Sequence, residues 1–141
     1  MTSDFDVDRF SRTLARDAPD AVIYADKEGT IRFWNAGAER IFGFREAEAI
    51  GRSLDIIIPE DLRKRHWTGF HKVVRTGQTR YSAGNALAVR ALRRDGGVVS
   101  VEFSMLPFRG EDGTILGVAA ILRDVRERVG VRGAHTDWMN L

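Results

Sequence analysis

Two Asp-Gly turn sequences divide the second half of the chain into three extended segments. The turns are residues 94–97 (Arg-Asp-Gly-Gly) and 111–114 (Glu-Asp-Gly-Thr), and the segments read as strands over residues 87–92, 98–108 and 115–123. Apolar and polar residues alternate strictly in the middle segment. The residues expected to face inward are Val99, Val101, Phe103 and Met105. This half of the chain therefore predicts a three-stranded antiparallel meander with one buried face.

The first half predicts a hairpin followed by a run of helices. Residues 21–26 and 31–34 have the character of strands, and residues 27–30 between them supply a turn. Asn35 then caps a helix that ends at Gly43. Further helices are expected over residues 46–50 and, with Pro59 at the start, over residues 60–75. The pattern indicates an α+β domain with helices on one face of a five-stranded antiparallel sheet.

A separate amphipathic helix is expected before the hairpin, within residues 1–17. Apolar residues recur there at helical spacing behind Ser3 and Asp4, and the helix is expected to end near Pro19. The stripe consists of Phe5, Val7, Phe10 and Leu14. Because this stripe has little core of its own to cover, we expect it to form a homodimer surface. The main domain is expected over residues 18–127, with a C-terminal tail over residues 128–141.

The composition excludes several classes of function. The chain has no cysteine, which removes disulfides, thiolate metal sites, thiol catalysis and cysteinyl adducts of cofactors. Its 22 Lys and Arg are interleaved with 20 Asp and Glu, so nucleic acid is not expected as a partner. The N-terminus carries acidic residues where a signal peptide is basic, and no apolar run approaches the roughly 20 residues that span a bilayer. We expect a cytoplasmic protein of one domain without a membrane partner.

Two of the three histidines lie in the helix predicted over residues 60–75. At about 100° per residue, His66 shares a stripe with Leu62, Phe70 and Val73, so it should point into the domain. His71 lies about 140° away by the same geometry, so the two cannot reach one ligand from the same side. Gly69, one turn after His66, would let a flat molecule approach the helix closely. His66 is therefore the candidate ligand for a bound cofactor. The alternative is that His66 is a buried core residue that hydrogen-bonds a backbone carbonyl.

Five segments of the chain, in order, resemble the PAS family. They are DAVIYADKEGTIRFWNAGAERIFGF, AIGRSL, IIPEDLRKRHWTGFHKVVRTG, LRRDGG with VVSVEFSMLP, and EDGTILGVAAILRDVRER. The resemblance covers about residues 18–127 and implies the PAS fold, in which the helices and the inner face of the sheet form a pocket. The segment EDLRKRH, residues 60–66, is similar to the haem-ligating helix of the oxygen-sensing haem PAS kinases of nitrogen-fixing bacteria. His66 falls on their proximal histidine, which implies haem b with His66 as its iron ligand.

The same resemblance implies roles for other residues around a haem. Phe103 and Met105 fall where the oxygen sensors place aliphatic distal residues, and Leu87 falls near their distal arginine, so that cationic donor is missing here. Met105 is either a sixth iron ligand or core packing. Arg80 and Tyr81 are the candidates for binding the propionates, with an exposed loop as the alternative for Arg80. The expected cofactor-binding set is His66, Gly69, Phe70, Arg80, Tyr81, Leu87, Phe103 and Met105.

Flavin is not expected in this chain. The light-sensing flavin subfamily requires a cysteine, and no motif favours a redox FAD. Nor does any catalytic constellation stand out without a cofactor, so any enzymatic activity would depend on haem.

We therefore expect a haem b-binding PAS sensor of a diatomic gas or of redox state. The PAS segment occupies most of the 141 residues, so we expect a stand-alone protein that signals through a homodimer or a partner protein. One alternative is a small haem-dependent enzyme of the peroxidase or oxygenase type. Another alternative is a cofactor-free PAS module for dimerisation or for binding a small ligand.

Overall fold

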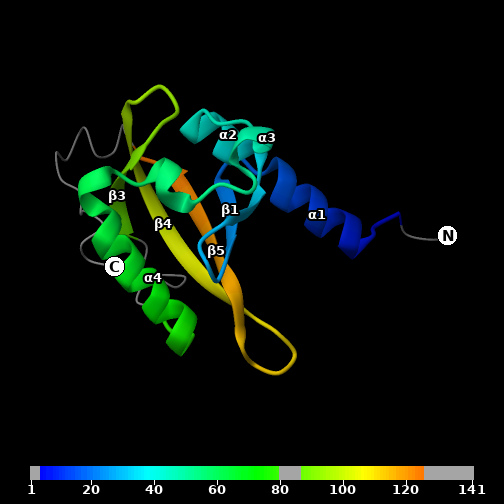
Figure 1. Ribbon diagram of the computed structural model, residues 1–141. Coiled ribbons are helices and arrows are strands. Elements are labelled where there is room, and N and C mark those ends of the chain that lie inside the picture. The colour runs from blue at the N-terminus through cyan, green and yellow to red at the C-terminus, as the bar shows by residue number, and fades with distance from the viewer. Residues whose placement is uncertain (1–3, 80–86, 126–141) are drawn as a thin grey trace.

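Five strands form a single antiparallel sheet (Figure 1). The structure, a computed structural model, describes residues 4–79 and 87–125. The strands are β1 (Ala21–Asp26), β2 (Ile31–Trp34), β3 (Leu87–Leu92), β4 (Val98–Arg109) and β5 (Ile115–Asp124). Their order across the sheet is β2-β1-β5-β4-β3, so the last strand of the meander pairs with the first strand of the hairpin. The expected fold class is confirmed, and the strand ends differ from the prediction by one residue at most.

The first helix precedes β1, and all the other described helices follow β2 and precede β3 in the sequence. They are α1 (Val7–Asp17), α2 (Ala36–Phe42), α3 (Glu46–Ala49) and α4 (Arg63–Thr76), with 3-10 turns η1 (Leu54–Ile57) and η2 (Glu60–Leu62). The prediction of one continuous helix from residue 60 was wrong. Pro59 precedes the 3-10 turn η2, and the α-helix begins only at Arg63, whose side chain donates to the carbonyl oxygen of Ile58 at 3.0 Å.

Asn35 confirms the predicted cap and joins three elements of the fold. It is 2% exposed, and its Oδ1 accepts hydrogen bonds from the backbone nitrogens of Ala38 (2.9 Å) and Val22 (2.8 Å). Its Nδ2 donates to the carbonyl oxygens of Ala15 (2.8 Å) and Asp20 (3.0 Å). One buried amide therefore caps α2 and holds the end of α1 against the start of β1.

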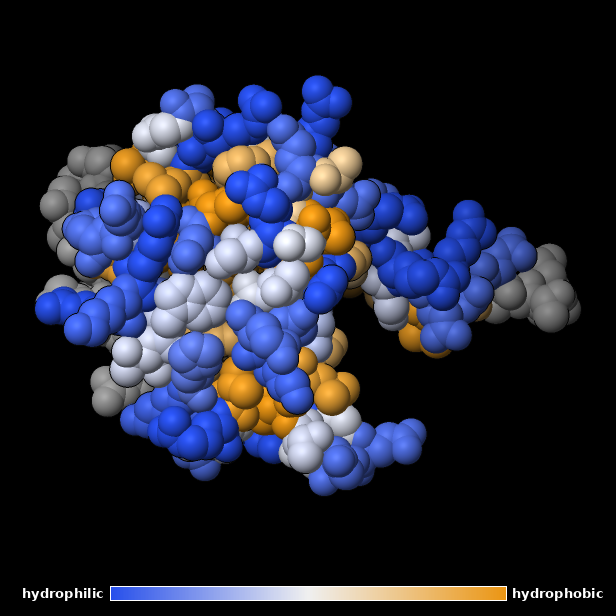
Figure 2. Space-filling view, viewed as in Figure 1, coloured by the Kyte–Doolittle hydropathy of each residue, from blue (hydrophilic) through white to orange (hydrophobic). Residues whose placement is uncertain are grey.

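The core lies on one face of the sheet, as the alternation in β4 predicted. Val99, Val101 and Phe103 are buried. Phe42 and other side chains of α2 pack with these residues on the inner face. Phe70 of α4 packs in a second cluster, with Ala25 of β1 and Val118 of β5. The helical middle region therefore covers a single face of the sheet, and Figure 2 shows apolar side chains between α4 and the strands behind it.

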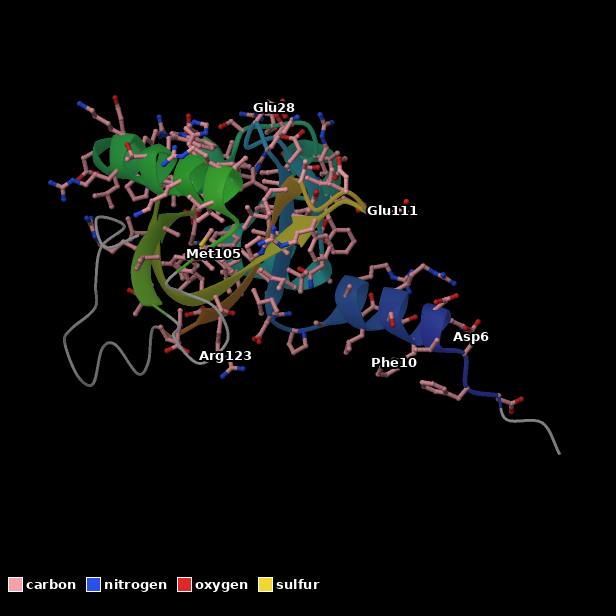
Figure 3. All side chains as sticks on the ribbon, turned by 90° about the horizontal axis from the view of Figure 1, so that it is seen from below. Asp6, Phe10, Glu28, Met105, Glu111 and Arg123 are labelled. Atoms are coloured by element: carbon pink, nitrogen blue, oxygen red, sulfur yellow. The ribbon has the colours of Figure 1, made fainter. Side chains whose placement is uncertain are left out.

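The N-terminal helix α1 extends away from the rest of the domain (Figure 3). It begins after Asp6, whose carboxylate accepts from the backbone nitrogen of Asp8 at 3.0 Å, and not after Ser3 or Asp4 as expected. All eleven residues of α1 are described, and none of them is buried. Among the described residues, no helix combines the length and apolar character that crossing a bilayer requires. The expected tail, residues 128–141, lies outside the described residues.

Candidate functional site

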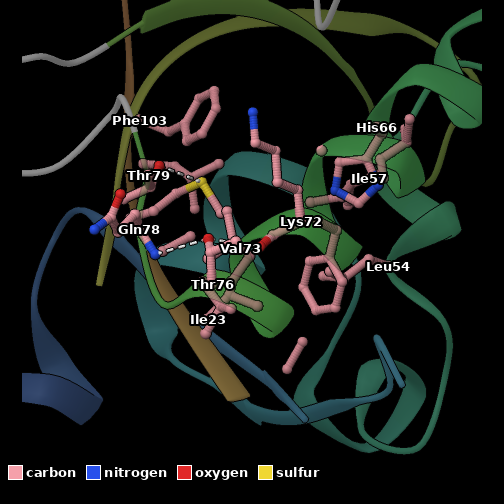
Figure 4. A pocket seen from close by; sticks show the side chains of 18 residues that line it. Ile23, Leu54, Ile57, His66, Lys72, Val73, Thr76, Gln78, Thr79 and Phe103 are labelled. Atoms are coloured by element: carbon pink, nitrogen blue, oxygen red, sulfur yellow. Dashed lines mark hydrogen bonds between the residues drawn. The ribbon is translucent and has the colours of Figure 1, made fainter. Parts of the chain in front are cut away.

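A cavity of about 330 Å³ lies between α4 and the inner face of the sheet (Figure 4). Ile23 of β1, Phe103 and Met105 of β4, and Ala120 of β5 contribute to the sheet wall. Residues of α4 form the opposite wall, and Leu54 belongs to a third side. Small-molecule sites in proteins are mostly apolar clefts of about 300–1,000 Å³ with a few polar groups. The cavity therefore has the size and lining of a small-ligand site.

His66 faces this cavity from α4, as predicted. The side chains of Leu62, His66, Phe70 and Val73 form the buried stripe of the segment, whereas His71 is exposed. His66 is 6% exposed and is among the few buried polar residues of the described chain. In Figure 4 it lies on the opposite side of the cavity from Thr79 and Phe103. The structure thus separates the two histidines of the helix in the manner that the helical spacing indicated.

Burial controls the protonation of His66. Removal from water lowers the pKa of this imidazole from 6.5 to about 4, because the charged form loses its hydration. The Asp55 carboxylate acts in the opposite direction, and His71 lowers the pKa further. The side chain is therefore neutral near pH 7. A neutral imidazole has the lone pair that a transition metal requires.

The lowered pKa predicts how the stability of the ligand-free protein depends on pH. Between about pH 6.5 and pH 4 the unfolded chain binds a proton at His66 that the folded protein does not, so stability falls as the pH falls. From about pH 7 to about pH 4.5 this contribution should remove ~2–3 kcal/mol of the free energy of unfolding. Urea denaturation of the parent and of His66→Leu at both pH values measures it. Equal pH dependence in the two proteins would contradict the assignment.

A small hydrogen-bonded group fixes the start of α4 beside His66. The indole Nε1 of Trp67 donates to Oδ1 of Asp55 at 2.7 Å, which ties α4 to η1. The Trp67 ring meets the His66 ring edge-on, with centroids 4.6 Å apart. A Cβ atom at Gly29 would lie 2.2 Å from the Trp67 ring, so the turn between β1 and β2 is packed directly against the indole. These contacts restrict the position of the helix turn that carries His66.

The cavity has a polar end that the sequence analysis missed. Lys72, Thr76, Gln78 and Thr79 line it where α4 ends, and all of them except Thr79 are exposed. The hydroxyl of Thr79 donates to the sulfur of Met105 at 3.6 Å. A thioether is a weak acceptor, so this hydroxyl is held only loosely against the sheet wall. The spacing of Gly69, Lys72 and Thr76 by three and four residues was the available signal, because it places them on one flank of the helix.

The predicted site residues are partly brought together. Those that line the cavity are His66, Gly69, Phe70, Phe103 and Met105. Leu87 begins β3 and pairs in register with Phe103, and its side chain lies outside the described part. Arg80 and Tyr81 also lie outside the described residues. Within residues 4–79 and 87–125, no group of three or more His, Cys, Asp and Glu side chains is placed to hold a metal ion.

Comparison with known proteins finds relatives that are described as sensor proteins. It is 35% identical over 94 residues to the sensor protein FixL of Bradyrhizobium diazoefficiens, a match that covers 67% of this chain and 18% of that protein. It is 26% identical over 83 residues to the oxygen sensor protein DosP of Escherichia coli, covering 59% of this chain and 10% of that protein. The chain thus spans less than a fifth of the length of these relatives.

A solved structure and a family model agree on the fold. The PAS domain of a protein from Colwellia psychrerythraea has a TM-score of 0.75 against this chain, at 22% identity, with 87% of this chain and 100% of that chain covered. A family model described as the PAS fold matches residues 15–130, which is most of the sequence. The chain therefore belongs to the PAS family.

Proposed function

We propose that this PAS domain binds haem b in the cavity, with His66 as the iron ligand, and senses a diatomic gas or redox state. The observation that carries the proposal is a buried, neutral imidazole that faces an apolar cavity from the first turn of α4. The resemblance of EDLRKRH to the haem-ligating helix of oxygen-sensing PAS kinases supports it. A relative described as an oxygen sensor protein supports the sensing role.

The types of side chain around the cavity suit the group. His66 would hold the haem iron, and a single histidine is sufficient for that role because the porphyrin supplies the iron's other nitrogen donors. Gly69 lies one turn beyond His66 and adds no side chain to that wall. Phe70 and Phe103 add apolar surface that would exclude water. The haem, when bound, would supply reversible ligand binding or a change of redox state at its iron.

Lys72 is the proposed partner of a ligand carboxylate, such as a haem propionate. It lines the cavity from α4 while its side chain also reaches solvent, which lets an ammonium remain hydrated beside an anion. Lys72→Met should speed the transfer of haem to an acceptor apoprotein about two- to fivefold, since exposed ion pairs are weak. Lys64→Met, an exposed lysine earlier on the same helix that is not among the cavity residues, is the matched control. Arg80 and Tyr81 remain candidates for the same role.

The absorption spectrum tests the proposal directly. Protein purified from cells and then incubated with haem should be red and should show a Soret band after unbound haem is removed by desalting. The haem content should approach one per chain. A protein that stays colourless after reconstitution, while circular dichroism shows that it is folded, would overturn the assignment of haem.

A second candidate is a small carboxylate ligand without a metal. The cavity volume of about 330 Å³ is at the lower end of the range for ligand sites, and its polar groups gather at the Lys72 end. A short apolar acid could place its chain against the sheet and its carboxylate near Lys72. Stabilisation of the protein against heating by straight-chain carboxylates, lost in Lys72→Met, would favour this candidate if no haem is taken up.

We also infer that the domain signals through a homodimer that uses α1. The apolar stripe of this helix is exposed along its length, with Phe10 at 50% and Leu14 at 56%. A second copy of the chain would remove this surface from water.

A further inference from the structure

The indole of Trp67, the residue after His66 in α4, is held on two sides by parts of the fold outside this helix. Its Nε1 donates to Oδ1 of Asp55 at 2.7 Å, which joins it to η1. A Cβ atom at Gly29 would overlap two carbon atoms of the ring, so the turn between β1 and β2 contacts the indole directly. The indole therefore cannot shift or rotate far unless Asp55 or this turn moves.

The two groups that hold the indole are themselves joined. The backbone nitrogen of Leu54, which precedes Asp55, donates to the carbonyl oxygen of Gly29 at 3.1 Å. The Ser53 hydroxyl accepts from the backbone nitrogen of Asp55 at 3.1 Å, and the guanidinium of Arg63 donates to the Asp55 carbonyl oxygen at 3.3 Å. The start of η1 and the turn between β1 and β2 thus form one hydrogen-bonded frame around the indole.

The indole in turn contacts the imidazole of His66. The two rings meet at 79°, with their centroids 4.6 Å apart. The Phe70 ring lies 5.9 Å from the imidazole and 5.2 Å from the indole between centroids. A buried ring that is bounded by two aromatic rings has few rotations open to it, because protein interiors are closely packed. The direction in which the imidazole faces the cavity therefore depends on the indole.

We propose that Trp67 is a positioning residue for His66, and that Asp55 and the turn at Gly29 act through it on the group that His66 holds. None of these three residues is among the described residues that line the cavity. Residues that orient a metal ligand commonly change the affinity about 10–100-fold when they are mutated. The inference rests on the haem ligation proposed above. It adds that a turn outside the cavity controls how firmly the haem is retained.

Gly29→Ala tests this control from a distance. The added methyl group displaces the indole, so haem should pass to an acceptor apoprotein about tenfold faster than from the parent. Gly96→Ala is the matched control. Its φ is 86°, against 84° at Gly29, and no atom lies within 4 Å of the added carbon, so it has the same backbone strain without the contact. Equal rates of haem transfer from the two alanine variants would overturn the proposal.

A double variant shows whether Gly29 acts through Trp67. Trp67→Leu should also speed the transfer of haem about tenfold, because the imidazole loses the ring that bounds it. The smaller leucine leaves room for a methyl group at Gly29. Adding Gly29→Ala to Trp67→Leu should therefore change the rate by less than about twofold, which is the non-additivity expected of residues in contact. A further tenfold increase in the double variant would contradict a route through the indole.

A measurement on the haem-free protein tests the hold of Asp55 on the indole. The ring current of the indole shifts the NMR signals of the His66 ring protons. Asp55→Ala keeps both rings and removes the hydrogen-bond acceptor, so these signals should move toward their positions in Trp67→Leu. Asp55→Asn keeps an oxygen that accepts the same bond, and should keep the signals of the parent. Near neutral pH the imidazole stays uncharged throughout, because burial lowers its pKa to about 4. Unmoved signals in Asp55→Ala would overturn the role of Asp55.

Failure of the haem assignment and failure of the positioning role give different results. A parent that takes up no haem refutes the proposed function. The His66 signals then still decide whether the frame fixes the ring, because Gly29→Ala should move them and Gly96→Ala should not. A parent that binds haem, with the same rate of transfer in Gly29→Ala and Trp67→Leu as in the parent, refutes only the positioning role. Circular dichroism of each variant shows that it is folded before the rates are compared.

Discussion

His66→Ala is expected to reduce the haem retained after desalting by at least about tenfold, and to remove most of the Soret absorbance. His66 faces the cavity, the chain has no cysteine, and no second histidine is buried within residues 4–79 and 87–125. The haem then keeps only its apolar contacts and its carboxylate partners. The measurement is the Soret absorbance per chain, with the haem quantified after extraction.

Two matched variants separate ligation from folding. His71→Ala should keep the full haem content, because His71 is exposed on the other side of the same helix. His66→Gly should be colourless alone and should regain the Soret band when free imidazole is added, since the vacated space can admit the missing ring. Rescue by imidazole is a result that a purely structural role for His66 would not produce. Equal haem content in His66→Ala and the parent would rule out this residue as the ligand.

Most of the fold could be predicted because its turns and caps are local. Gly43 ends α2 with a φ of 86°, and the Asp-Gly sequences at residues 95–96 and 112–113 stand at the two hairpin turns of the meander. The start of α4 could not be predicted in the same way. Its 3-10 turn depends on the Arg63 side chain reaching the carbonyl oxygens of Ile58 and Asp55, a contact that forms only when η1 has packed in place.

In the candidate site too, positions set by local structure could be predicted and positions set by tertiary contacts could not. His66 could be found from the sequence because one helix sets its direction, and helical spacing is regular. Gln78 and Thr79 at the polar end of the cavity could not be found in this way, because their position needs the chain to turn after α4 and return to the sheet. Gly77 makes that turn with a φ of 72°, and Thr79 then meets Met105, 26 residues further along the chain. Tertiary contacts of this kind leave no periodic signal in the sequence.

Asn35→Ala is expected to lower the free energy of unfolding by about 3–5 kcal/mol. The variant leaves the backbone nitrogens of Val22 and Ala38 without their acceptor in a region closed to water, and it removes the donor that three carbonyl oxygens share. Each buried group that loses its partner costs about 1–3 kcal/mol. Urea denaturation followed by tryptophan fluorescence measures the change, because Trp34 is buried next to this residue in the chain.

A second cap in the same protein is the control for Asn35. The Ser53 side chain accepts from the backbone nitrogen of Asp55 at 3.1 Å at the start of η1, but this bond is exposed to water. Ser53→Ala should therefore cost about 0.5–1 kcal/mol. Asn35→Asp keeps the acceptor and replaces the donor with a carboxylate that faces carbonyl oxygens, so it should release α1 while α2 stays capped. If Asn35→Ala cost no more than Ser53→Ala, α1 would be held by other contacts, and its direction away from the sheet would need another cause.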